Sequence, residues 1–198
     1  MTIPFIPEQS ALLVMDFQRQ IISRYFSEDA ANAILNKTAT LIAAARAAKV
    51  KVMYVVVGFR EGYPEISSRN KVFSAIKANG LFAAGCPDNE IHEAVAPLAD
   101  EPVITKHRIS ALQGTDLDMI LKSQGITTLI MSGLTTSGVV LSTTRQAFDL
   151  DYNLLIAEDC CADGKEEVHR FLLDNILSQH AEVLGADELI KRMESSAN

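Results

Sequence analysis

Residues 127–156, TTLIMSGLTTSGVVLSTTRQAFDLDYNLLI, contain the pattern that decides the fold. Residues 127–131 form a short apolar run, and residues 153–156 form another. Between them, after Gly133, apolar residues return at three- and four-residue steps as far as Leu150, which is typical of one face of a helix. A strand, a helix and a strand in this order predict two parallel strands joined by a crossover helix.

The same alternation extends in both directions along the chain. Short runs rich in Val, Ile and Leu are separated mostly by segments with helical spacing, which predicts a parallel sheet covered by helices on both faces. The predicted strands are residues 11–15, 50–57, 103–104, 127–131, 153–156 and 182–184. The predicted helices include a long one ending near residue 48 and capped by Ser27, and others at 116–122, 139–150, 166–178 and 187–193.

One long segment, residues 58–102, is less regular. Several Gly and Pro residues punctuate it, and residues 90–96 are its only stretch predicted to be helical. The segment is long for a plain connection. Two readings remain open, a loop that covers a substrate and an insertion that only pads the surface.

Composition limits the class of protein. The chain has 198 residues, 48% of them apolar, which predicts a single domain over residues 1–198 with a full hydrophobic core. It has 18 basic and 25 acidic side chains, a formal net charge of −7, and few basic clusters beyond residues 106–108. No nucleic-acid partner is therefore expected.

Cellular location also follows as an expectation. The first residues, MTIPFIPEQS, lack the basic and apolar regions of a leader, and no apolar run approaches the length of a membrane span. We expect a cytoplasmic protein with no membrane partner. Cys86, Cys160 and Cys161 are odd in number and two are adjacent, which favours reduced thiols over a disulfide framework.

Candidate site residues lie at the ends of predicted strands. Asp16 follows the first strand, Lys106 the third, and the loop 133–139 the fourth. Ligands of open parallel sheets bind outside the carboxyl ends of the strands, so these groups are expected to converge. A carboxylate beside an ammonium in a dry pocket can act in proton transfer. The alternative is that Asp16 caps a turn and Lys106 is a solvated lysine.

The loop 133–139, GLTTSGV, places small residues at the start of a helix. Backbone N–H groups at such a position stabilise a carboxylate, a phosphate or a developing oxyanion. The spacing is not that of a P-loop or of GxGxxG, so nucleotide binding is not indicated. Alternatively, Thr135, Thr136 and Ser137 form only an N-cap cluster.

Four motifs in this order resemble the isochorismatase-like hydrolase family, which includes cysteine hydrolases such as nicotinamidases. They are LLVMDFQ at 12–18, ITKHRISALQGTDL at 104–117, LIMSGLTTSGVVLSTTRQAFDLDY at 129–152 and AEDCCAD at 157–163. The resemblance implies a three-layer α/β/α sandwich around a six-stranded, mainly parallel sheet of order 3-2-1-4-5-6. It also implies a homo-oligomer, a dimer or a tetramer.

The resemblance further implies catalytic roles. Cysteine hydrolases of the family use an Asp, a Lys and a Cys, and Asp16 and Lys106 match the first two. The Cys would fall one residue after Gly138, where this chain has Val139. Isochorismatases proper also lack the Cys and cleave a vinyl ether with the Asp as general acid. By resemblance, Asp16 is the acid, and Lys106 tunes its pKa and binds a substrate carboxylate.

Other residues are candidates for the same site. The resemblance implies a cis peptide bond between Leu134 and Thr135, and an oxyanion hole made of the N–H groups of Thr135 and Val139. Gln18, Arg60 and Arg69 are candidates for substrate binding, the arginines through paired N–H donors. Alternatively, either arginine is only a surface charge.

No metal and no cofactor are expected. The four histidines are scattered, with neither an i, i+4 pair nor a Cys at ligand spacing. Nicotinamidases of the family place an Asp and histidines after the second strand, where this chain has no histidine before His92, so the resemblance does not favour nicotinamide as a substrate. The favoured function is hydrolysis of a small, anionic molecule by Asp16 and Lys106 without a covalent Cys intermediate. The alternatives are a non-catalytic homologue that binds a small molecule or acts as a scaffold, and an amidase with a relocated nucleophile.

Overall fold

A six-stranded sheet, parallel throughout, forms the centre of the molecule, with strand order β3-β2-β1-β4-β5-β6. The computed structural model describes residue 3 and residues 5–196, so the outermost residues of the predicted domain 1–198 lie outside the described part. The strands are β1 (Ser10–Met15), β2 (Lys51–Val57), β3 (Val103–Lys106), β4 (Thr128–Leu134), β5 (Asn153–Ala162) and β6 (Glu182–Leu184). The predicted fold class and strand order are confirmed.

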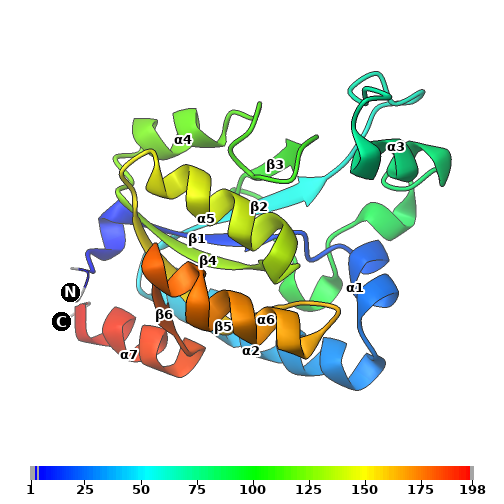
Figure 1. Ribbon diagram of the computed structural model, residues 1–198. Helices are drawn as coiled ribbons and strands as arrows, with labels where there is room; N and C mark the ends of the chain where they lie inside the picture. Colours follow the sequence, from blue (N-terminus) through cyan, green and yellow to red (C-terminus); the bar gives the residue numbers. More distant parts are fainter. Residues whose placement is uncertain (1–2, 4, 197–198) are drawn as a thin grey trace.

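Helices cover both faces of this sheet, which makes three layers (Figure 1). They are α1 (Arg19–Tyr25), α2 (Glu28–Ala47), α3 (Lys71–Ala78), α4 (Leu117–Ser123), α5 (Leu141–Phe148), α6 (Glu166–Asn175) and α7 (Ala186–Ser196). Helices α2 and α7 pack on one face, and α4, α5 and α6 on the other. None of the helices described is long and apolar enough to span a membrane.

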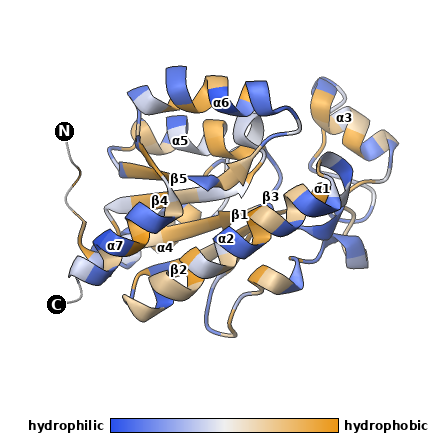
Figure 2. Ribbon diagram, turned by 90° about the horizontal axis from the view of Figure 1, so that it is seen from below, coloured by the Kyte–Doolittle hydropathy of each residue, from blue (hydrophilic) through white to orange (hydrophobic). Residues whose placement is uncertain are grey.

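The two cores follow from the alternation of side chains along β1. Leu12 and Val14 point toward α2, whereas Leu13 and Met15 point toward α4 and α5, and all four are buried. Strands buried on both faces are apolar along their length, which Figure 2 shows as orange strands between helices with mixed blue and orange turns. The sheet is thus a rigid base for the residues that follow the ends of its strands.

The order in which successive strands are added to the sheet reverses at β1. Met15 pairs with Val55 of β2 on one side and with Gly133 of β4 on the other. The connections after β1 and β4 therefore run in opposite directions and leave a crevice at the carboxyl ends of these strands, where ligands of such sheets bind. In Figure 1 the strand arrows point toward the side on which α1 and α3 lie.

Two elements of the irregular segment differ from the prediction. The helix predicted at 90–96 is wrong: only a 3-10 turn, Glu93–Val95, forms there. Ile91 pairs with Gln18 in an antiparallel bridge, so the chain is extended where the helix would start. The segment instead contains α3, whose N-cap Asn70 accepts a hydrogen bond from the backbone N of Phe73.

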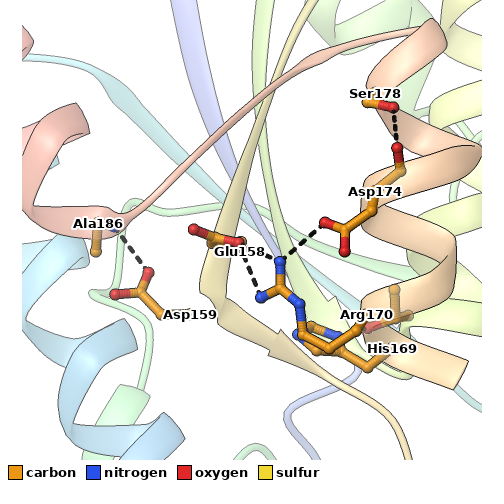
Figure 3. Close-up of polar contacts among 8 residues, drawn as sticks. Glu158, Asp159, His169, Arg170, Asp174, Ser178 and Ala186 are labelled. Carbon is orange, nitrogen blue, oxygen red and sulfur yellow. Dashed lines mark hydrogen bonds and ion pairs between the residues drawn. The ribbon is translucent and has the colours of Figure 1, made fainter. Parts of the chain in front are cut away.

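Strand β5 is longer than predicted, because it continues beyond Glu158 and Asp159 to Ala162. The pairing with β4 shifts between Met131 and Gly133, and this irregularity turns the two acids out of the sheet. Figure 3 shows where they go. Glu158 binds Arg170 of α6 at 3.0 Å, and Asp159 accepts a 2.7 Å hydrogen bond from the first backbone N of α7.

Candidate active site

Asp16 and Lys106 meet at the carboxyl end of the sheet. Asp16 follows β1 directly, with a φ of 61° and its backbone N bonded to the Val55 carbonyl at 2.8 Å. Lys106 is the last residue of β3. Their side chains are 6% and 5% exposed, and Lys106 Nζ lies 2.9 Å from Asp16 Oδ2. The two predicted catalytic residues are therefore brought into direct contact.

The two side chains of this pair differ in their environment and in their hydrogen-bond partners. Burial raises the pKa of Asp16, and the nearby Lys106 ammonium opposes this rise only in part. Lys106 Nζ also donates to the backbone oxygen of Arg108 at 3.2 Å. By contrast, Asp16 Oδ1 is buried without a hydrogen-bond partner among the described residues. A buried carboxylate oxygen of this kind is a position for a ligand or a transferred proton.

The loop after β4 forms the other side of the site. Just before this loop, Gly133 of β4 is packed so closely that an added Cβ would lie 3.1 Å from both Cβ and O of Met15. The peptide bond between Leu134 and Thr135 is cis, as the resemblance implies. Thr135, Gly138 and Val139 line the same cavity as Asp16 and Lys106, and Val139 is 2% exposed.

Neighbouring elements hold this loop. Thr136 is fully buried, and its hydroxyl shares a 2.7 Å hydrogen bond with Nδ1 of His169 on α6. The backbone N of Ser137 donates to Asp163 Oδ2 at 2.7 Å. Burial lowers the pKa of His169, which keeps the imidazole neutral. The loop is thus fixed from β5 and α6, independently of the Asp16–Lys106 pair.

The cavity at this site measures about 180 Å³. Its polar end consists of Asp16, Lys106 and Arg108, together with the loop after β4. Most of the remaining lining is apolar and comes mainly from α1 and α3: Ile21, Tyr25, Val72, Phe73 and Ile76. Segment 58–102 therefore does contribute a wall of the cavity, which favours the first of its two readings.

Gln18 lies elsewhere. Its side-chain amide donates at 2.9 Å to the carbonyls of Val57 and Asn89, and its oxygen accepts from the backbone N of Val57 at 2.8 Å. Gln18 lines a neighbouring cavity of about 550 Å³ that includes His107 but neither Asp16 nor Lys106. The structure thus gives Gln18 a backbone-binding role next to the site.

The two arginine candidates are also apart from the pair. Arg60 is 72% exposed in its side chain, binds Glu65 at 2.6 Å, and lines the neighbouring cavity. Arg69 is exposed and lines neither cavity. The arginine that does line the site is Arg108, which sequence reasoning missed. Arg108 comes only two residues after Lys106, and this closeness in the sequence could have indicated that it lies near the site.

None of the three cysteines lines the cavity of Asp16 and Lys106. Burial raises the pKa of Cys160 to about 12 and also raises that of Cys161. All three are free thiols, and Cys86 is half-buried. Within the described part of the chain, no three His, Cys, Asp or Glu side chains group in a way that would hold a metal ion.

Comparison with known proteins identifies the family. The isochorismatase domain model matches residues 10–188. The chain therefore belongs to the isochorismatase family of hydrolases. An uncharacterized isochorismatase family protein of Escherichia coli O157:H7, YecD, is 31% identical over 186 residues, covering 93% of this chain and 96% of the relative.

Other relatives have more specific names. The ureidoacrylate amidohydrolase RutB of Pantoea ananatis is 32% identical over 194 residues, covering 88% of this chain and 78% of the relative. A cysteine hydrolase structure from Pseudomonas syringae pv. phaseolicola 1448A superposes with a TM-score of 0.90 at 25% identity, covering 98% and 97% of the two chains. N-carbamoylsarcosine amidase from Thermoplasma acidophilum gives a TM-score of 0.75 at 25% identity, covering 90% and 97%.

Proposed function

We propose that this protein hydrolyses a small anionic molecule by acid–base chemistry at Asp16 and Lys106, with water rather than a side chain as the nucleophile. The observation that carries the proposal is the buried Asp16 carboxyl group, which lines the cavity, contacts Lys106 through Oδ2 and has no hydrogen-bond partner for Oδ1 among the described residues. The raised pKa of Asp16 suits a proton donor.

Val139 is the second support. By the family resemblance this residue occupies the position of the nucleophilic Cys, and its side chain has no group that can attack a carbonyl. The thiols of Cys160 and Cys161 are buried with raised pKa values, which disfavours them as substitutes. The hydroxyls in the cavity lining are those of Tyr25 and Thr135.

For a vinyl ether, the proposed steps balance as follows. Protonated Asp16 gives its proton to the terminal alkene carbon, and the adjacent carbon becomes a cation stabilised by the ether oxygen. Water adds to that carbon and returns a proton to the Asp16 carboxylate. The hemiketal then breaks into a ketone and an alcohol. When the hemiketal breaks, N–H groups of Thr135 and Val139 would stabilise the negative charge that develops on the departing alcohol oxygen.

Amide hydrolysis is a second candidate, because RutB and the Thermoplasma protein carry the names of amide-cleaving enzymes. In this chain it would need a relocated nucleophile, for which the cavity lining offers the hydroxyls of Tyr25 and Thr135. A non-catalytic binding protein is the third. It would use the same cavity and leave its ligand intact.

One experiment separates the three. Purified protein is incubated with panels of vinyl ethers, esters and amides of small carboxylic acids, and intact-protein mass spectrometry follows each reaction after rapid quenching. We expect turnover without any added mass on the protein. Asp16→Asn should lower kcat by roughly 10²–10⁴-fold, whereas Asp187→Asn, at an exposed site, should not.

Other outcomes would contradict the proposal. A trapped acyl group on the protein would establish the relocated nucleophile. Ligands that raise the melting temperature but are never converted would establish the binding protein. Unchanged turnover in folded Asp16→Asn or Lys106→Ala protein would refute the role of the pair.

A further inference from the structure

We infer that Arg108 binds the anionic group of the ligand, and that the cavity selects small monocarboxylates with a short apolar body. This inference rests on the proposed function only in assuming that the ligand occupies the cavity of Asp16 and Lys106. Arg108 is half-buried and lines that cavity. Its guanidinium lies 5.7 Å from the centre of the Phe73 ring.

The contacts of Arg108 leave its charge uncompensated. Nη2 donates to the backbone oxygen of Glu65 at 3.2 Å, and Nη1 donates to the backbone oxygen of His107. Among the described residues, no carboxylate lies within 4.0 Å of this guanidinium. Carbonyl oxygens fix the orientation of an arginine, but they do not neutralise its charge.

Comparison with other arginines of the described chain shows that a half-buried arginine without a carboxylate partner is unusual in this protein. Arg46, Arg170 and Arg192 are each bound to at least one carboxylate at 3.1 Å or less. Arg24, Arg69 and Arg145 are exposed, where water solvates the charge. Arg108 is neither exposed nor paired. A guanidinium in this situation is suited to bind a carboxylate through parallel N–H donors.

The charges that line the cavity favour an anionic ligand. When Asp16 is ionised, its charge neutralises that of Lys106, which lies 2.9 Å away. One surplus positive charge then remains in the cavity lining, that of Arg108. Protonation of Asp16 increases the surplus. An anion is therefore favoured in both protonation states, and one carboxylate suffices to neutralise Arg108.

Size and polarity define the remainder of the ligand. A volume of about 180 Å³ corresponds to roughly six water molecules at the density of the liquid. An apolar wall of the cavity is made of Ile21, Val72, Phe73, Ile76 and Phe82, which offer no hydrogen bonds from their side chains. A short apolar or unsaturated carbon skeleton would pack on this wall.

The test compares crotonate with crotonamide, which have nearly the same shape and differ in charge. Ligand-observed NMR titration at constant ionic strength measures each Kd. We expect crotonate to bind the wild type at least tenfold more tightly than crotonamide. Arg108→Gln should weaken crotonate binding by tenfold or more and leave crotonamide unchanged. Arg69→Gln, at an exposed arginine outside the cavity, is the matched control and should bind crotonate like the wild type.

The outcomes are decisive. Equal affinity for acid and amide, no binding of crotonate to the wild type, or an unchanged crotonate Kd in folded Arg108→Gln protein would each overturn the inference. Asp16→Asn separates it from the proposed function, because this variant should still bind crotonate even though it lacks the proposed proton donor. Loss of the proposed chemistry with retained crotonate binding would leave the inference intact.

Discussion

Lys106 controls the protonation of Asp16, and this gives a pH prediction at the scale of single residues. Protonated Asp16 is the proposed active form, so kcat/KM should fall as pH rises through the raised pKa of Asp16. The Lys106 ammonium lowers that pKa. Lys106→Met should therefore move the alkaline limb of the pH profile upward by about one unit or more.

The control for this shift is Lys77→Met on the exposed side of α3, which should keep the wild-type profile. An alkaline limb that stays in place, or moves to lower pH, in the Lys106 variant would show that another group controls it.

Val139 supports a second prediction at this scale. Val139→Cys in a Cys86→Ser background places a thiol in the cavity, while burial keeps Cys160 and Cys161 protonated. Thiolates are the reactive form, so iodoacetamide should label residue 139 roughly a hundredfold faster than the two buried cysteines. Peptide mass spectrometry over time measures the three rates. Equal rates would mean that this position does not face the cavity.

The sequence put Asp16 and Lys106 at the ends of parallel strands, which share one edge of the sheet, and the family resemblance made them a catalytic pair. It did not predict Arg108, since a cation beside a strand end is normally solvated and only packing on Phe73 brings it inside. Nor could it predict that the Gln18 amide binds backbone groups, because those groups come from residues far along the chain.

At the scale of elements, Gly133 sets how closely β4 approaches β1. Gly133→Ala would place a methyl group 3.1 Å from Cβ and O of Met15 and 3.3 Å from Val139. Since backbone cannot move aside cheaply, we expect a loss of roughly 1–3 kcal/mol in the free energy of unfolding, measured in urea. Gly185→Ala, whose methyl would be 3.9 Å from its nearest neighbour, should lose far less. Equal losses would contradict this account.

Helix α6 carries a pH-dependent contribution through His169. Because the folded state lowers the pKa of this imidazole, its stabilising contribution is present above the ordinary value near 6.5 and is lost as pH falls toward the folded value. The wild type should lose melting temperature between pH 7.5 and 5. His169→Gln should lose less over the same range, whereas His92→Gln should keep the wild-type loss. A steeper loss of melting temperature in the His169 variant would show that His169 is not the source of the pH dependence.

Elements were predictable where periodicity was strong. All six strands were expected, since Val, Ile and Leu cluster in short runs, which are buried most completely in β1 and β4. Helices α1 and α3 were not expected: α1 has only seven residues, and α3 lies among Gly and Pro residues that indicate loops. The full length of β5 was also hidden, because Glu158 and Asp159 look like a strand end but are turned outward by the shifted pairing with β4 (Figure 3).

For the whole molecule, oligomerisation remains a prediction from the family resemblance. We expect a dimer or a tetramer in sedimentation velocity. Phe148 of α5 and Phe171 of α6 are 47% and 58% exposed on the same helical layer, and such aromatic residues are enriched in interfaces. Phe171→Glu should therefore lower the oligomer mass while preserving the fold by circular dichroism. A monomeric wild type at micromolar concentration would contradict the expectation.

The hydrogen bonds of Gln18 also bear on how this family changes its substrates. One amide binds the chain at Val57, where the irregular segment leaves the sheet, and again at Asn89, after α3. Residues 58–88 thus form a closed loop whose two ends are held together next to Asp16. Replacements inside that loop can reshape the apolar wall while the acid and the lysine stay where β1 and β3 hold them. Residues 58–88 could therefore be replaced, by evolution or by design, to change which ligand fits the cavity while Asp16 and Lys106 keep their positions.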